Sequence, residues 1–153
     1  MSGKDSAAED LAIDLAQAKM HHSLAKKALG EFWTKVYRSK AGSDDTRGLI
    51  NAITTLDSHE QSAMSAFRQL LANHPTSVPI MRSYAFYLSD ITDEKERAEE
   101  LLSMATEIED QESKQHALQQ HQQQQQQIKK KKKVEMARNV KEEHPISALP
   151  IPE

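Results

Sequence analysis

The sequence predicts an all-α fold that is followed by a low-complexity tail. Apolar residues recur at helical spacing through residues 9–110. All seven aromatic residues lie between Phe32 and Tyr87, so the last third of the chain contains none. We therefore expect a helical module over residues 9–110 and a tail over residues 111–153 that has too little apolar surface to form a core.

Composition excludes several classes of protein. The chain has no cysteine, which removes disulfides, thiol catalysis and cysteine-based zinc sites. Its first ten residues, MSGKDSAAED, lack the apolar segment of a secretory signal, and its longest uncharged apolar stretch is shorter than the roughly 18–20 residues that cross a bilayer. These features favour a cytoplasmic location, with the nucleus as an alternative. Residues 1–110 carry a net charge of −6 and residues 111–153 carry +3, which makes the module a poor nucleic-acid binder.

The first predicted helix begins near Ser6 or Asp10 and ends at about Lys40. Its seam follows the alternating steps of four and three that are typical of a heptad repeat. The seam residues are Leu11, Leu15, Ala18, His22, Ala25, Leu29, Phe32 and Val36. Two interpretations remain open, an intramolecular packing face and a homotypic coiled coil. Trp33 and Tyr37 widen the stripe, and we expect Trp33 to be buried.

A loop, AGSDDTRG (residues 41–48), precedes the second helix, and Ser43 or Asp44 is expected to cap it. The helix should run from about Asp45 to Asn73, with a short break near Asp57–Glu60 as an alternative. Its apolar stripe is interrupted only by Glu60.

The stretch HPTSVPIMRSYAFYLSDI places a break beside an apolar segment. Pro75 disfavours helix at the residue before it, so the second helix should stop there. Thr76 or Ser77 is expected to cap the third helix, with Pro79 in its first turn. The apolar face of this helix is wide enough to be buried on two sides, as in the middle helix of a stack.

A fourth helix is expected after a cap at Thr92 or Asp93, and its apolar residues thin out after Glu109. The Gln- and Lys-rich segment beyond it should form a disordered or fraying helix that buries nothing, with some helix persisting through Gln127. The final HPISALPIPE contains three prolines and is expected to be disordered.

The spacing of the last three helices is typical of a tetratricopeptide-like antiparallel helical repeat module. Small residues let paired helices approach, and large ones fill the space between them. The structural repeat positions that we predict are Trp33, Ala63, Phe67, Leu70, Pro75, Met81, Tyr84, Ala85, Leu88, Ala98, Leu102 and Ala105. An unrelated antiparallel bundle is the alternative.

Three blocks of the sequence also resemble a known family. They are HSLAKKALGEFW, HPTSVPIMRSYAFYL and AEELLSMATEIE. Together they resemble the helical-repeat segment of the tiny macrocysts B/C proteins of protists and early-branching fungi, over about residues 9–114. That resemblance implies a longer parent protein with membrane spans and PAS sensor domains. Neither is present in this sequence, so the chain looks like a detached repeat module or a fragment. Half-tetratricopeptide repeats of RNA-processing scaffolds resemble the HPTSVPIMRSYA segment less closely.

No residue pattern indicates catalysis, a metal or a cofactor. His21 and His22 are adjacent and so diverge on a helix, unlike the i, i+4 pair of a helical zinc site. The consecutive residues Asp57–Glu60 contain the letters of a catalytic triad but cannot converge on one substrate. We expect a non-enzymatic interaction or spacer module with a protein partner and no small-molecule substrate.

The run Lys129, Lys130, Lys131, Lys132 and Lys133 permits three interpretations. It is a solvated tail, a nuclear-import signal, or a weak contact for an anionic membrane or nucleic acid. The last of these supports the alternative function, an RNA-processing scaffold whose basic tail touches RNA.

Overall fold

The computed structural model describes residues 3–40, 42 and 45–143. Within these residues every regular element is helical and none is a strand. The elements are α1 (Gly3–Lys40), α2 (Thr46–Asn73), α3 (Val78–Tyr87), the π-helical turn η1 (Leu88–Thr92) and α4 (Lys95–Glu143). The chain forms two compact units, Met1–Glu109 and Asp110–Glu153. The predicted all-α class is confirmed.

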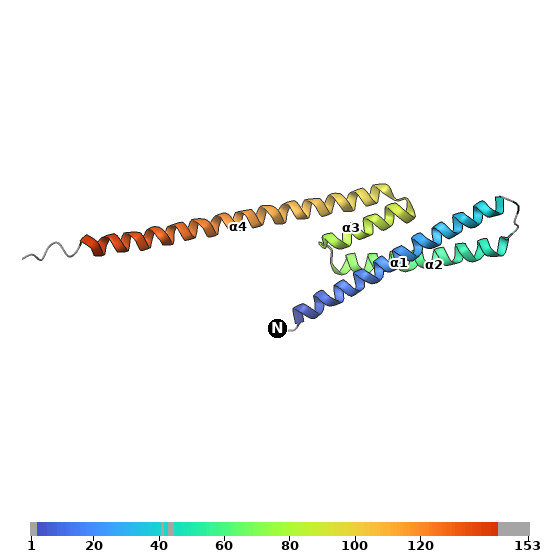
Figure 1. Ribbon diagram of the computed structural model, residues 1–153, viewed down its shortest axis with the longest axis horizontal. Coiled ribbons are helices and arrows are strands. Elements are labelled where there is room, and N and C mark those ends of the chain that lie inside the picture. The colour runs from blue at the N-terminus through green and yellow to red at the C-terminus, as the bar shows by residue number, and fades with distance from the viewer. Residues whose placement is uncertain (1–2, 41, 43–44, 144–153) are drawn as a thin grey trace, which may run out of the picture. The chain divides into compact units, whose positions relative to one another are not determined.

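In the first unit, α1 and α2 form an antiparallel pair (Figure 1). Ala25 and Ala28 of α1 and Ala52 of α2 are buried, and such small side chains let two helix backbones approach closely. The Lys35 ammonium also donates a hydrogen bond of 3.3 Å to the carbonyl of Gly48. The heptad seam of α1 is therefore an intramolecular packing face, as the first of the two interpretations predicted.

The start of α2 is capped one residue later than expected. The Asp45 carboxylate accepts a hydrogen bond of 2.9 Å from the amide of Gly48, which satisfies a free donor of the first turn. The predicted caps Ser43 and Asp44 lie outside the described residues. α2 then continues without a break through Asp57–Glu60, so the alternative of two shorter helices is wrong.

α2 ends and α3 begins close to the prolines that predicted the break between them. α2 ends at Asn73, before Pro75, and the His74 amide still donates to the carbonyl of Leu70 at 2.8 Å. Ser77 occupies the N-cap position of α3, and Pro79 lies in its first turn. The Ser77 side chain makes no capping hydrogen bond, so its predicted role is met by position only.

The connection between α3 and α4 differs from the prediction. The π-helical turn η1 follows Tyr87, and Asp93 adopts a left-handed backbone with φ of 56°. The Thr92 hydroxyl donates to the carbonyl of Leu88 at 2.9 Å. Because α4 begins only at Lys95, neither Thr92 nor Asp93 occupies the residue before it. Tertiary contacts of η1 with α1, described below, account for this local departure.

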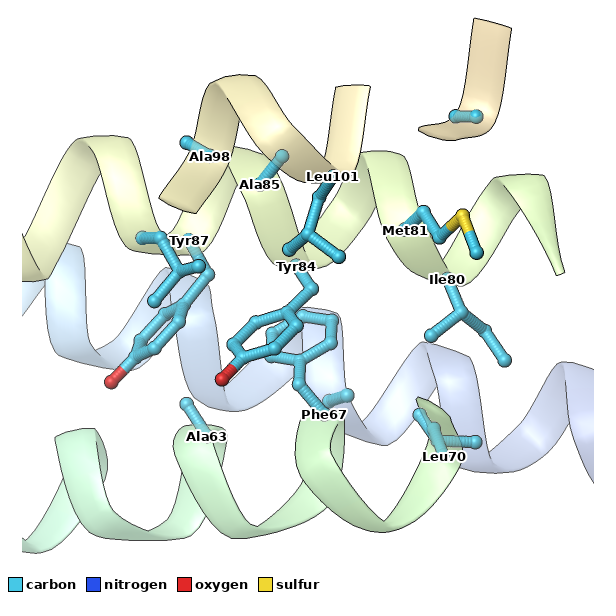
Figure 2. Close-up of a cluster of buried hydrophobic side chains, with 13 residues drawn as sticks. Ala63, Phe67, Leu70, Ile80, Met81, Tyr84, Ala85, Tyr87, Ala98 and Leu101 are labelled. Atoms are coloured by element: carbon cyan, nitrogen blue, oxygen red, sulfur yellow. The ribbon is translucent and has the colours of Figure 1, made fainter. Parts of the chain in front are cut away.

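The core of the first unit lies between α1, α2, α3 and the start of α4. Phe67 stacks on Tyr84 with ring centroids 5.5 Å apart, and Tyr87 packs beside both rings. On the other side of α3, Ala85 faces Ala98 and Leu101 of α4 (Figure 2). α3 is thus buried on two sides, as its wide apolar face predicted. The buried cluster comprises Ala18, Ala63, Phe67, Leu70, Ile80, Met81, Tyr84, Ala85, Tyr87, Leu88, Ala98, Leu101 and Ala105.

The second unit is described as far as Glu143 and consists of helix only. α4 continues well beyond Gln127, because Gln and Lys are fair helix formers and no Gly or Pro occurs between Lys95 and Glu143. Its side chains from Asp110 to Lys141 are all exposed, in agreement with the expectation that this region buries nothing. The segment HPISALPIPE lies outside the described residues.

Candidate protein-interaction surfaces

Most residues of the predicted repeat pattern lie in the core. The buried ones are Ala63, Phe67, Leu70, Met81, Tyr84, Ala85, Leu88, Ala98 and Ala105. Pro75 is exposed and ends α2, and Leu102 is 38% exposed. Leu102 directly follows Leu101, which takes the buried position on this turn of α4, so the next residue is rotated by about 100° toward solvent.

Trp33 does not lie in the core, so the expectation that it is buried is wrong. Its side chain is 58% exposed and rests edge-on against Phe32, with ring centroids 5.4 Å apart. The apolar stripe of α1 predicted a buried position for Trp33, because a stripe identifies which side of a helix packs. It does not tell how far along α1 the covering helix extends. α3 ends at Tyr87, and Trp33 lies beyond the part of α1 that this helix and η1 contact.

Three other large side chains near the turn between α1 and α2 are also exposed: Tyr37 at 79%, Ile50 at 57% and Ile53 at 51%. Trp33 and Tyr37 are neighbours four residues apart on α1, and Ile50 and Ile53 are neighbours three apart on α2, and we call these four exposed side chains the Trp33 surface. It carries aromatic side chains from the last turns of α1 and aliphatic ones from the first turns of α2. The sequence alone predicted a packing stripe here. It did not reveal that one part of this stripe is exposed to solvent.

The Trp33 surface continues the face that α3 and η1 cover. Residues seven apart lie on the same side of a helix. Trp33 lies seven residues after Lys26, whose ammonium contacts Asp90 of η1 at 3.3 Å. Ile53 lies seven residues before Glu60, whose carbonyl accepts a hydrogen bond from α3. One continuous face of the α1–α2 pair is therefore covered along part of its length and exposed along the rest.

A polar contact fixes η1 against α1. The Asp90 carboxylate lies 3.2 Å from Nε2 of His22 and 3.3 Å from the Lys26 ammonium. The His22 ring also meets the Tyr87 ring edge-on at 5.6 Å. Sequence reasoning placed His22 in the α1 seam and missed this contact, because its partners lie more than sixty residues away in the chain. No local sequence signal identifies such a pair.

A groove of about 460 Å³ lies between α2 and the start of α4. Met64, Leu71 and Tyr84 supply apolar lining, and Arg68 and Arg97 supply cations. Sequence analysis missed this groove, since its two arginines come from different helices and match no motif.

The other residues considered for chemistry do not converge. The run Asp57–Glu60 lies on one continuous helix, which keeps its side chains apart. Burial and, to a smaller extent, the negative charge of Asp57 raise the pKa of Glu60, and this is explained by packing beneath Tyr87. Across the part of the chain that the structure describes, no group of three or more His, Asp or Glu side chains could hold a metal ion.

The lysine run Lys129–Lys133 lies on the exposed part of α4. Successive residues of a helix point about 100° apart, so five in a row surround it and define no single face. Apolar residues in the same region, such as Val134 and Met136, are exposed and do not form a separate stripe. The tail therefore has the geometry of a solvated cationic helix and lacks that of an amphipathic membrane anchor.

Antiparallel helices that cross at alanines and enclose aromatic side chains define a helical-repeat protein of the tetratricopeptide type, a class that serves protein interaction. The chain matches the family described as "TmcB, TPR repeats" over residues 7–115 and belongs to it. It is 30% identical over 97 residues to tiny macrocysts protein B of Dictyostelium discoideum. That match covers 63% of this chain and 7% of the relative's length. No solved structure matches the chain. Across the described residues, no helix combines the length and apolar character that crossing a membrane requires.

Proposed function

We propose that this chain is a non-enzymatic module that binds another polypeptide through the Trp33 surface. The observation that carries the proposal is the 58% exposure of Trp33 on a face that α3 covers elsewhere. Tryptophan and tyrosine dominate the energetics of protein interfaces, and contiguous exposed apolar residues are typical of interaction sites.

The way α3 and η1 cover the same face suggests the chemistry of the partner. α3 presents apolar side chains to the α1–α2 pair, and η1 places Asp90 at its edge against Lys26. Lys40 lies seven residues after Trp33 and so provides an exposed cation at the corresponding edge of the Trp33 surface. We infer that the partner presents an amphipathic helix with an apolar stripe and an adjacent acidic residue, lying in line with α3.

Selection from a displayed library of amphipathic helical peptides tests this proposal. Peptides selected on the full chain should carry an apolar stripe beside an acidic residue, and their binding should shift the emission of Trp33, the only tryptophan of the chain. The double variant Trp33→Ala/Ile53→Ser should bind them at least tenfold more weakly. The matched control is Phe86→Ser, which removes an aromatic residue that is 61% exposed on α3. Equal binding by the double variant and the wild type would contradict the proposal.

The relative suggests that the module works inside a longer polypeptide, with the exposed helix of residues 110–141 as a spacer. The support is the 7% of the relative's length that the chain covers. Sequencing the full transcript tests this point. Membrane spans or a PAS domain in the same reading frame would support it, and stop codons flanking the present sequence would contradict it.

An RNA-processing scaffold is the second candidate, favoured by the exposure of every lysine in the run Lys129–Lys133. Counterion release makes such contacts strongly dependent on salt. A gel shift with RNA that weakens with salt and disappears on removal of residues 111–153 would support this function. RNA binding that survives the deletion, or its absence in the full chain, would exclude it.

A further inference from the structure

The groove between α2 and α4 shares no residue with the Trp33 surface. Its α2 side is one ridge, because Met64, Arg68 and Leu71 follow one another at spacings of four and three. Its other side is formed by Glu94, which directly precedes α4, and by Arg97 in the first turn of α4. All these residues belong to the first unit. The volume of about 460 Å³ falls in the range of roughly 300–1,000 Å³ that is common for ligand sites.

The two arginines of this groove are not engaged by acidic side chains. The described residues form ion pairs elsewhere, between Arg82 and Glu109 and between Lys26 and Asp90. No carboxylate in the described part of the chain forms an ion pair with Arg68 or Arg97. Glu94 lines the same groove, so its charged side chains sum to one net positive charge.

The accessible apolar lining of the groove comes from α2. Tyr84 also lines the groove but is only 2% exposed. Met64 and Leu71 are half-buried and lie against the core. A ligand that fits must therefore place an apolar group on Met64 and Leu71 and negative charge beside Arg68 and Arg97. The guanidinium group binds carboxylates in a planar, two-point geometry, which a single surface lysine does not offer.

We propose that this groove binds an acidic segment of another polypeptide, in which an apolar side chain that packs on Met64 and Leu71 is flanked by carboxylates on Arg68 and Arg97. Nucleic acid fits less well, because residues 1–110 carry a net charge of −6 and the charged side chains of the groove sum to only one net positive charge. The site is independent of the Trp33 surface, so a partner can occupy either one alone.

A fluorescein-labelled peptide in which glutamates alternate with leucines tests the site on the full chain. The double variant Arg68→Gln/Arg97→Gln should weaken binding at least tenfold, and raising the salt concentration should weaken binding to the wild type. Arg82→Gln is the matched control, because Arg82 is an exposed arginine outside the groove. Trp33→Ala should also leave binding unchanged, which separates this site from the proposed function.

Two further peptides define the chemistry, one with lysine in place of glutamate and one with serine in place of leucine. Both should bind at least tenfold more weakly than the parent peptide. Amide chemical-shift changes in the wild-type chain should centre on residues 64–72 and 94–97, which locates the site even if a variant fails to fold. Undetectable binding, unchanged affinity in the double variant, or shifts centred elsewhere would each overturn the proposal.

Discussion

The hydroxyl of Tyr87 donates a hydrogen bond of 3.0 Å to the main-chain carbonyl of Glu60 and so joins α3 to the middle of α2. The two residues are 27 positions apart, and the Tyr87 side chain is fully buried. The bond satisfies a buried phenol that would otherwise lose its partner on leaving water. It lies where the covered part of the α1–α2 pair gives way to the exposed part.

Removing this hydroxyl should weaken the first unit. Tyr87→Phe keeps the ring contacts with Phe67 and Tyr84 and loses only the bond to Glu60, which should lower the free energy of unfolding by about 1 kcal/mol. Urea unfolding followed by circular dichroism measures the change. Tyr37→Phe is the control, because that side chain is 79% exposed. Identical midpoints for wild type and Tyr87→Phe would show that the bond contributes nothing.

The Tyr87 hydroxyl should also make the free energy of unfolding fall at high pH. Burial, and then the negative charge of Glu60, raises the pKa of Tyr87 from 10.0 to about 12. Between these values the unfolded chain has lost the phenol proton while the folded chain keeps it. The contribution of Tyr87 is therefore complete below pH 10 and is lost as the pH rises toward 12. Unfolding free energies measured across this window should fall more steeply for the wild type than for Tyr87→Phe. Parallel curves would contradict the assignment.

Trp33→Ala should leave the fold nearly as stable as the wild type. Surface substitutions usually change the free energy of unfolding by less than about 0.5 kcal/mol, and the partial burial of Trp33 adds little to this. Phe67→Ala, at a fully buried position, should cost about 3–5 kcal/mol. Thermal melts of both variants give the comparison. A loss for Trp33→Ala as large as that for Phe67→Ala would mean that Trp33 packs in the core.

Deleting residues 119–153 should leave the melting temperature of the first unit unchanged. Side chains from Asp110 to Lys141 are exposed, so the deletion removes helix without removing buried surface. In the full chain, amides between Gln122 and Lys133 should exchange quickly with deuterium, because local opening breaks no tertiary contact. A large drop in melting temperature, or slow exchange in this segment, would show that the tail packs on the module.

Helix positions could be predicted from the sequence because their signals are local. Pro75 and Pro79 mark the break before α3, and the alanines of α1 predicted a packing seam. The π-helical turn could not be predicted in this way, since Asp90 is held by residues of α1 that are far away in the chain.

The exposure of Trp33 and the groove at Arg68 and Arg97 depend on tertiary structure as well. The exposure of Trp33 depends on where α3 ends along α1. The groove depends on which turn of α4 lies beside α2. Helix persists beyond Gln127 although this segment buries little apolar surface. The uninterrupted helix formers of this segment give helix without tertiary contacts.

The most direct test is a thermal unfolding experiment on residues 1–110. Far-ultraviolet circular dichroism and tryptophan emission are recorded on the same sample. We expect a strongly helical spectrum, one cooperative transition, and emission from Trp33 in the folded state close to that of a tryptophan in water. That result would establish a self-contained helical module that exposes Trp33 to solvent. A strand-rich spectrum, a melt without cooperativity, or strongly blue-shifted emission from the isolated module would contradict it.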